Sequence, residues 1–166
     1  TANFSVPARN GPVDDAADRE HKINYPRRRE GALRTSFGMY GFPAPVKSAL
    51  AATPAEREQM YEERWQQGGS INFLSAYTDL LTNLEANETA SEFVRRKIRS
   101  IVQDPAVAER LCPKDHPIGS KRLCLDTDYY ETFNRPNVTL VDLKSDPIEE
   151  ITPRGIRTRK THYDLD

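Results

Sequence analysis

The middle of the chain carries the three- and four-residue spacing of apolar positions that is typical of amphipathic helices. One helix start is clearly marked, because Thr53-Pro54-Ala55-Glu56 is a capping box with proline at the first helical position. Gly68-Gly69 then predicts the end of that helix near Gln67. The predicted helices cover residues 13–34, weakly and with a break at Pro26, then 54–67, 70–83, 87–103 and 105–111.

Alternation of apolar and polar residues, which is typical of strands, occurs toward the two ends of the chain. Phe4 and Val6 predict a first strand, and Val138–Leu143 predicts another. Residues 148–152 and 156–158 flank a Pro-Arg-Gly turn and predict a β-hairpin, and the final THYDLD predicts the start of one more strand. We therefore expect an α+β chain of three parts, which are a strand end with a linker over residues 1–12, a helical insertion over 13–112 and a strand-bearing segment over 113–166.

Composition narrows the class of protein. The chain has 166 residues, of which 37% are hydrophobic and 30% are charged, so it can form a core of its own. A formal net charge of −1 argues against a nucleic-acid partner, and we find no apolar run long enough to cross a membrane. With no signal peptide and two cysteines that form no disulfide framework, we expect a cytoplasmic protein with reduced thiols. The histidines lack metal-ligand spacing, so we expect no metal.

Two adjacent cations, Lys121 and Arg122, follow Gly119-Ser120, and two adjacent tyrosines and then a strand-like run come after them. Glycine allows close backbone approach and serine offers a hydroxyl, so this pattern is compatible with a phosphate or another anion. A solvated charge pair explains the same residues, and spacing alone leaves both interpretations open. No glycine-rich dinucleotide fingerprint occurs, so the chain by itself does not hold a dinucleotide in the usual way.

Several stretches together carry a family resemblance. PIGSKRLCLDTDYYETFNRPNVTLVDL over residues 117–143, followed by PIEEITPRGIRT over 147–158, closely resembles the flavin-dependent Baeyer–Villiger monooxygenases, such as the cyclohexanone, phenylacetone and steroid monooxygenases. TANFSVPARN over 1–10, RWQQGG over 64–69 and the run over 86–114 resemble the same family in the same order. The resemblance covers nearly the whole chain and is most specific between Pro117 and Asn134.

The resemblance implies roles for five residues. Lys121 matches a lysine at the 2′-phosphate of NADPH, and Thr1 matches a threonine beside that phosphate. Arg122 matches an arginine that reaches the flavin and stabilises the peroxyflavin anion and the adduct formed with a ketone. Leu123 and Leu74 match positions near the substrate pocket, although both also fit plain core positions.

The resemblance also implies a fold and an activity. It predicts a mainly helical insertion flanked by strands of an incomplete Rossmann-like NADPH-binding domain, in a fragment that lacks the FAD domain. The parent protein is expected to use FAD and NADPH to convert a small-molecule ketone to an ester or lactone through a C4a-peroxyflavin. The fragment alone is expected to be inactive and to bind neither cofactor. The alternatives are a related N- or S-oxygenating flavin monooxygenase, against which Arg122 argues, and a non-catalytic helical interaction module that self-associates.

Overall fold

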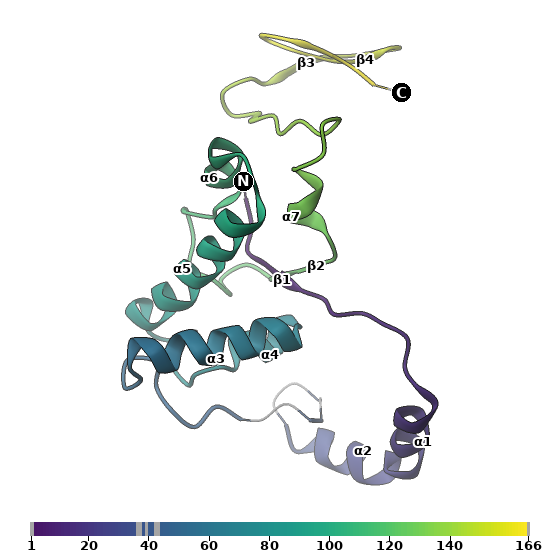
Figure 1. Ribbon diagram of the computed structural model, residues 1–166, viewed down its shortest axis with the longest axis vertical. Helices are drawn as coiled ribbons and strands as arrows, with labels where there is room; N and C mark the ends of the chain where they lie inside the picture. The colour runs from purple at the N-terminus through teal and green to yellow at the C-terminus, as the bar shows by residue number, and fades with distance from the viewer. Residues whose placement is uncertain (1, 36–37, 39, 42–43, 166) are drawn as a thin grey trace.

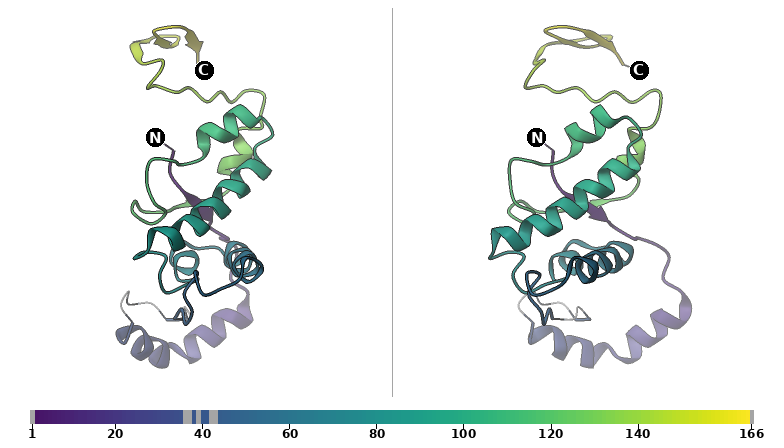
Figure 2. Two further views of the ribbon diagram at one scale, coloured as in Figure 1. Left: turned by 90° about the vertical axis from the view of Figure 1, so that its left-hand side faces the viewer. Right: turned by 60° about the vertical axis from the view of Figure 1, so that its left-hand side comes forward.

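The computed structural model describes the chain except for residues 1, 36–37, 39, 42–43 and 166. Figures 1 and 2 show an elongated arrangement in which a small sheet lies at one end, a pair of helices lies at the other, and the remaining helices lie between them. The elements in chain order are β1 (Ser5–Pro7), α1 (Asp15–Ile23), α2 (Tyr25–Leu33), α3 (Pro54–Gln67), α4 (Ser70–Leu74), α5 (Leu84–Ile101), α6 (Pro105–Leu111), β2 (Cys124–Asp126), α7 (Tyr129–Thr132), β3 (Ile148–Thr152), β4 (Gly155–Thr158) and β5 (His162–Asp164).

Three helices begin at the capping residues that the sequence marks, whereas α5 begins at Leu84 after Asn83, three residues before its predicted start at 87. The Thr53 hydroxyl accepts a hydrogen bond from the Glu56 amide at 3.3 Å, while the Glu56 carboxylate accepts one from the Thr53 amide at 2.7 Å. This confirms the capping box of α3, and the helix ends at Gln67 before Gly68 as predicted. Asp104 caps α6 and Asp14 caps α1 through their carboxylates, because these oxygens satisfy amide donors that the helix leaves free.

The strands form two separate sheets among the described residues. β1 and β2 pair in parallel, with Ser5 opposite Cys124, although they lie 119 positions apart in the chain. β3, β4 and β5 form an antiparallel meander at the opposite end from α1 and α2 (Figure 1). The hairpin and the final strand are therefore confirmed, as is the α+β class of the chain.

One core joins β1 and the central helices. Phe4, just before β1, and Val6, within it, are each 1% exposed, and they belong to the same buried cluster as residues of α3 and α5. An aromatic group at its centre packs edge to face or tilted, with ring centroids 5.5–6.5 Å apart. Its members are Tyr61, Trp65, Phe73, Tyr77 and Phe93. The core contains residues from both sides of the predicted divisions at 12/13 and 112/113. The domain limits themselves stay a prediction.

The predicted helix over residues 70–83 is wrong beyond its first turn. The helix α4 ends at Leu74, and the chain then turns so that Asp79 accepts hydrogen bonds from the Ser48 hydroxyl and the Ala49 amide. The apolar stripe from Leu74 to Leu84 therefore does not form one helix face. Tyr77 and Leu80 are buried in the core, whereas Leu81 and Leu84 are exposed.

The sequence pattern also failed at two strands. Val138–Leu143 forms no strand, because within the described part of the chain no other segment pairs with it. β2 was not predicted, since three residues are too few to show a clear alternation. Its strand character comes from pairing with β1, through hydrogen bonds such as that from the Cys124 amide to the Phe4 carbonyl at 3.1 Å.

Candidate functional site

The two candidate cations lie in the segment of residues 117–123, here called the Lys-Arg loop, which lies between α6 and β2 and leads directly into β2. Its first half is held by the side chain of Asn87 on α5. The Asn87 amide accepts from the Ile118 amide at 3.0 Å and donates to the Ile118 and Leu80 carbonyls at 2.8 Å each. Ser91 adds a contact of 3.4 Å to the Ile118 amide. Because Asn87 is 5% exposed and Ser91 is fully buried, water does not compete with these bonds.

Gly119 gives the loop a close approach to two leucines. Its φ of +84° lies in the left-handed region, and a Cβ at this position would stand 2.6 Å from Leu81 Cδ2 and 3.3 Å from Leu74 Cδ2. Glycine is required here for both reasons. The structure thus brings Leu74, a predicted pocket residue, next to the Lys-Arg loop across more than forty positions of sequence.

The second half of the loop is held by the N-terminal segment. The side-chain amide of Asn3 donates to the Arg122 carbonyl at 2.9 Å, and the backbone amide of Cys124 donates to the Phe4 carbonyl at 3.1 Å. Leu123, the other predicted pocket residue, is 4% exposed and belongs to the core cluster. Thr1, predicted to lie beside the cofactor phosphate, falls outside the described residues.

The side chains of Lys121 and Arg122 are exposed between these two anchors. Within the described chain, neither side chain makes a hydrogen bond or an ion pair with a protein group. Lys121 acts at longer range on Asp115, whose pKa is lowered mainly by a hydrogen bond from His116 and also by the charge of Lys121. The loop therefore presents two positive charges to solvent on a backbone that is fixed at both ends.

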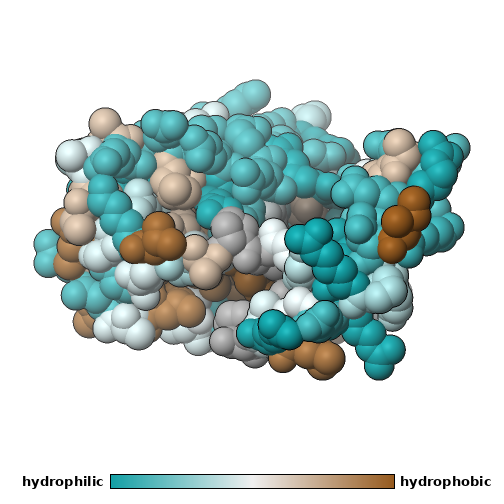
Figure 3. Space-filling view, turned by 90° about the horizontal axis from the view of Figure 1, so that it is seen from below, coloured by the Kyte–Doolittle hydropathy of each residue, from teal (hydrophilic) through white to brown (hydrophobic). Residues whose placement is uncertain are grey.

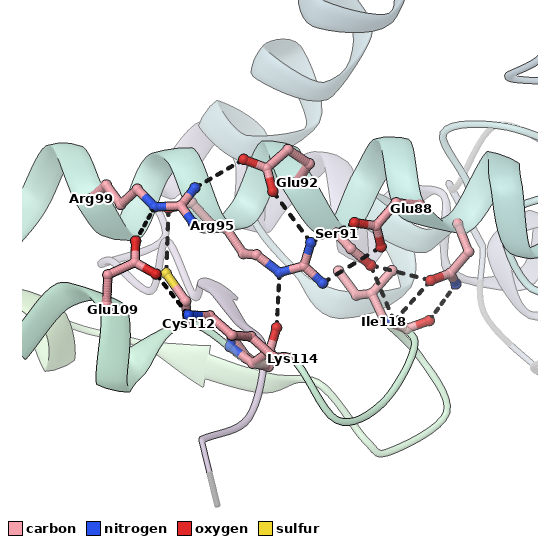
Figure 4. Close-up of polar contacts among 11 residues, drawn as sticks. Glu88, Ser91, Glu92, Arg95, Arg99, Glu109, Cys112, Lys114 and Ile118 are labelled. Atoms are coloured by element: carbon pink, nitrogen blue, oxygen red, sulfur yellow. Dashed lines mark hydrogen bonds and ion pairs between the residues drawn. The ribbon is translucent and has the colours of Figure 1, made fainter.

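The other cations near this loop are engaged by the fold itself. Arg95 on α5 donates to the Pro113 carbonyl at 2.8 Å and binds Glu88 and Glu92 at 2.7 and 3.2 Å, as Figure 4 shows. In the same view Arg99 joins Glu92 to Glu109, which also binds Lys114. The Arg99–Glu109 pair joins α5 to α6, and each of these three cations has a carboxylate partner.

Sequence reasoning missed the residues that hold the loop. Asn87 showed only a chance glycosylation triplet, and Asn3 and His116 showed no motif at all. Their partners lie far away in the chain, so no local spacing could have indicated them. The described residues contain no group of three or more His, Cys, Asp or Glu side chains suited to a metal ion. In the same part of the chain, no helix is both long and apolar enough to cross a membrane.

Comparison with known proteins finds enzymes that are similar to this chain over most of its length. A Baeyer–Villiger monooxygenase of Pseudooceanicola batsensis is 43% identical over 158 residues, which are 95% of this chain and 28% of that protein. A phenazine N-monooxygenase of Lysobacter antibioticus is 39% identical over 159 residues, which are 95% of this chain and 29% of that protein. No family model matches the chain.

Solved structures agree with the sequence relatives. The crystal structure of OTEMO in complex with FAD and NADP matches with a TM-score of 0.92 and 42% identity, over 100% of this chain and 31% of that one. The chain therefore matches one segment of these larger proteins over its whole length. Its relatives include Baeyer–Villiger monooxygenases, and it spans about 30% of their length, which confirms the family resemblance of the sequence motifs.

Proposed function

We propose that the full-length protein containing this chain is an FAD- and NADPH-dependent Baeyer–Villiger monooxygenase that converts a small-molecule ketone to an ester or lactone. The proposal is supported by relatives that span 95–100% of this chain and by the OTEMO structure solved with FAD and NADP. In that protein this chain would supply the helical insertion and part of the NADPH-binding domain. We expect the protein to act in the cytoplasm.

One structural observation carries the proposal. Lys121 and Arg122 are adjacent and exposed, and within the described chain no carboxylate pairs with either of them, whereas Arg95 and Arg99 nearby are paired. Two unpaired cations on a fixed loop fit two anionic groups. This arrangement is compatible with the phosphates of NADPH and with the anionic centre of a flavin reaction.

The two cations differ in the anion that each suits. Lys121 carries a compact charge with three donors, so we assign to it the 2′-phosphate of NADPH, together with Thr1. Arg122 carries a planar fork of donors, so we assign to it the stabilisation of negative charge that develops beside the carbonyl during oxygen insertion. Bound FAD would supply the activated oxygen. Leu74 lies against Gly119, and together with Leu123 it would form part of the apolar wall near the ketone.

A direct test uses the full-length protein. Purified with FAD and supplied with NADPH, oxygen and cyclohexanone, it should form the lactone and consume NADPH in proportion. Lactone formation that needs NADPH supports the proposal. Consumption of NADPH without oxygenated product, over a panel of cyclic, linear and aryl ketones, would refute it.

N-oxygenation is a second candidate that one observation favours. The phenazine N-monooxygenase matches this chain at 39% identity, so likeness over this segment does not separate the two reactions. The same preparation assayed with phenazine in place of a ketone distinguishes them. A phenazine N-oxide formed faster than any lactone would favour the second candidate.

An interaction module that self-associates is the remaining alternative. The face shown in Figure 3 is mostly hydrophilic, and its apolar residues form small separate patches. Small patches of this kind are normal on a protein surface and do not by themselves indicate an interface. Sedimentation of the full-length protein over a range of concentrations would test self-association independently of the assays above.

A further inference from the structure

The side chain of Asn3 joins the N-terminal segment to the backbone of Arg122. Its Nδ2 donates to the Arg122 carbonyl at 2.9 Å and lies 3.5 Å from Cys124 Sγ. Its Oδ1 accepts from the Phe4 amide at 2.9 Å and lies 3.2 Å from His116 Nε2. The side-chain amide of Asn3 therefore contacts the residue before β1, the first residue of β2 and the end of the Lys-Arg loop at once.

The orientation of this amide is determined by its neighbours. A backbone N–H such as that of Phe4 only donates, and a carbonyl such as that of Arg122 only accepts. A flipped Asn3 amide would place donor against donor and acceptor against acceptor, so only one orientation satisfies both groups. It follows that His116 Nε2 carries the hydrogen that faces Asn3 Oδ1.

His116 is itself held in place. Its Nδ1 lies 2.6 Å from the Asp115 carboxylate, and its ring packs edge to face on Phe4 with centroids 5.4 Å apart. The ring is only 7% exposed. A carboxylate accepts hydrogen bonds, so both ring nitrogens of His116 face acceptors.

We propose that Asn3, whose side-chain oxygen also lies against His116, is a positioning residue for Arg122. This inference rests on the proposed function. The Asn3 amide fixes the peptide plane that follows Arg122, and that plane sets the direction in which the guanidinium leaves the backbone. A donor that stabilises developing charge works best when its position is set before the reaction begins. Lys121 lies one residue earlier and lacks this tether, so the effect should be specific to Arg122.

The test uses the full-length protein with Asn3→Asp, which keeps the size of the side chain and replaces the donor with an oxygen. Asn3→Ala serves as a second, uncharged variant. We expect the ester formed per NADPH oxidised to fall about tenfold in both, as for the loss of one well-placed hydrogen bond. The KM for NADPH should stay unchanged, which a general loss of structure would not allow.

Two further variants separate positioning from folding. His116→Gln keeps a donor toward Asn3 Oδ1, so it should retain more ester yield than His116→Ala. Asn134 provides the matched control, because its amide also donates to one carbonyl, that of Ile101, and accepts from one amide, that of Gln103, at 2.8 Å each. Asn134→Asp should lower the melting temperature without changing the ester formed per NADPH.

The outcomes distinguish this inference from the proposed function. Wild-type ester yield in a folded Asn3→Asp protein overturns the inference, as does an equal loss of yield in Asn134→Asp. Should the Asn3 variants fail to fold, equal yields in His116→Gln and His116→Ala overturn it. A wild-type protein that forms no ester refutes the proposed function and this role of Asn3 together.

Discussion

The arginines of α5 and the cations of the Lys-Arg loop carry the same charge in opposite settings. The Arg95 side chain is 11% exposed and meets two carboxylates and a carbonyl, while its guanidinium lies 5.8 Å from the centre of the Phe4 ring. Lys121 and Arg122 are exposed and, among the described residues, have no such partner. A cation that is buried and paired with carboxylates therefore stabilises the fold. A cation that is exposed and unpaired is available to a ligand.

The two regions also differ in what is fixed. On α5 the fold holds the charged ends of the side chains, through the pairs shown in Figure 4. In the Lys-Arg loop it holds the backbone, through Asn87 at Ile118 and Asn3 at Arg122, and leaves the charged ends unengaged. A fixed backbone with open side chains lets a site meet its ligand without first reordering the chain.

The largest expected effect is at Arg122. In the full-length protein Arg122→Ala should lower the rate of ester formation by about a hundredfold or more, because one preset donor at a developing charge contributes this much. Arg122→Lys should not restore the rate, since an ammonium does not reproduce the planar fork. The measurement is ester formed over time at saturating NADPH and ketone. A normal rate in Arg122→Ala would place Arg122 with the structural arginines.

A smaller effect, on stability and not on chemistry, is expected at Arg95. Arg95→Met leaves the Pro113 carbonyl without its donor and should lower the free energy of unfolding by about 2 kcal/mol. Arg96→Met is the control, because Arg96 is 48% exposed and pairs with Glu58 at the surface, where an ion pair contributes about 1 kcal/mol or less. Denaturant unfolding of both variants compares them. Equal losses would contradict the distinction between the two arginines.

Lys121→Ala should affect the cofactor alone. Loss of a charge-assisted contact to phosphate is expected to raise the KM for NADPH about tenfold and to erode the preference for NADPH over NADH. Lys114→Ala is the control, since Lys114 already binds Glu109 at 2.7 Å and should leave both values unchanged. Steady-state kinetics with each cofactor provide the measurement, and an unaltered preference in Lys121→Ala would exclude this role.

The smallest effect concerns acid stability of the paired region. Hydrogen bonds from Arg99 and Lys114 lower the pKa of Glu109 from 4.5 to about 2. A carboxyl with a depressed folded-state pKa stabilises the protein fully above its unfolded value, and this contribution is lost as pH falls from about 4.5 to 2. Glu109→Gln should therefore flatten the fall in melting temperature between pH 5 and 3 only slightly, because the group is exposed. A steeper fall in the variant would contradict this sign.

Local signals in the sequence were sufficient for several elements. The capping box at Thr53 and Glu56 bounded α3, because cap and helix are neighbours in the chain. The hairpin of β3 and β4 could be predicted for the same reason. They were not sufficient for residues 70–83, where Asp79 bonds to Ser48 and ends the helical path, or for Val138–Leu143, which lacks a strand partner among the described residues.

The sequence by itself determined that Lys121 and Arg122 are adjacent cations in a loop, and its motifs determined the family. Only the tertiary structure decided that these cations have no partner among the described residues, whereas Arg95 and Arg99 pair with Glu92. It also decided that Asn3 and Asn87 hydrogen-bond to the loop backbone. The physical reason is distance along the chain. A hydrogen bond between residues 119 positions apart produces no local pattern in the sequence, because it forms only once the core has brought the two segments together.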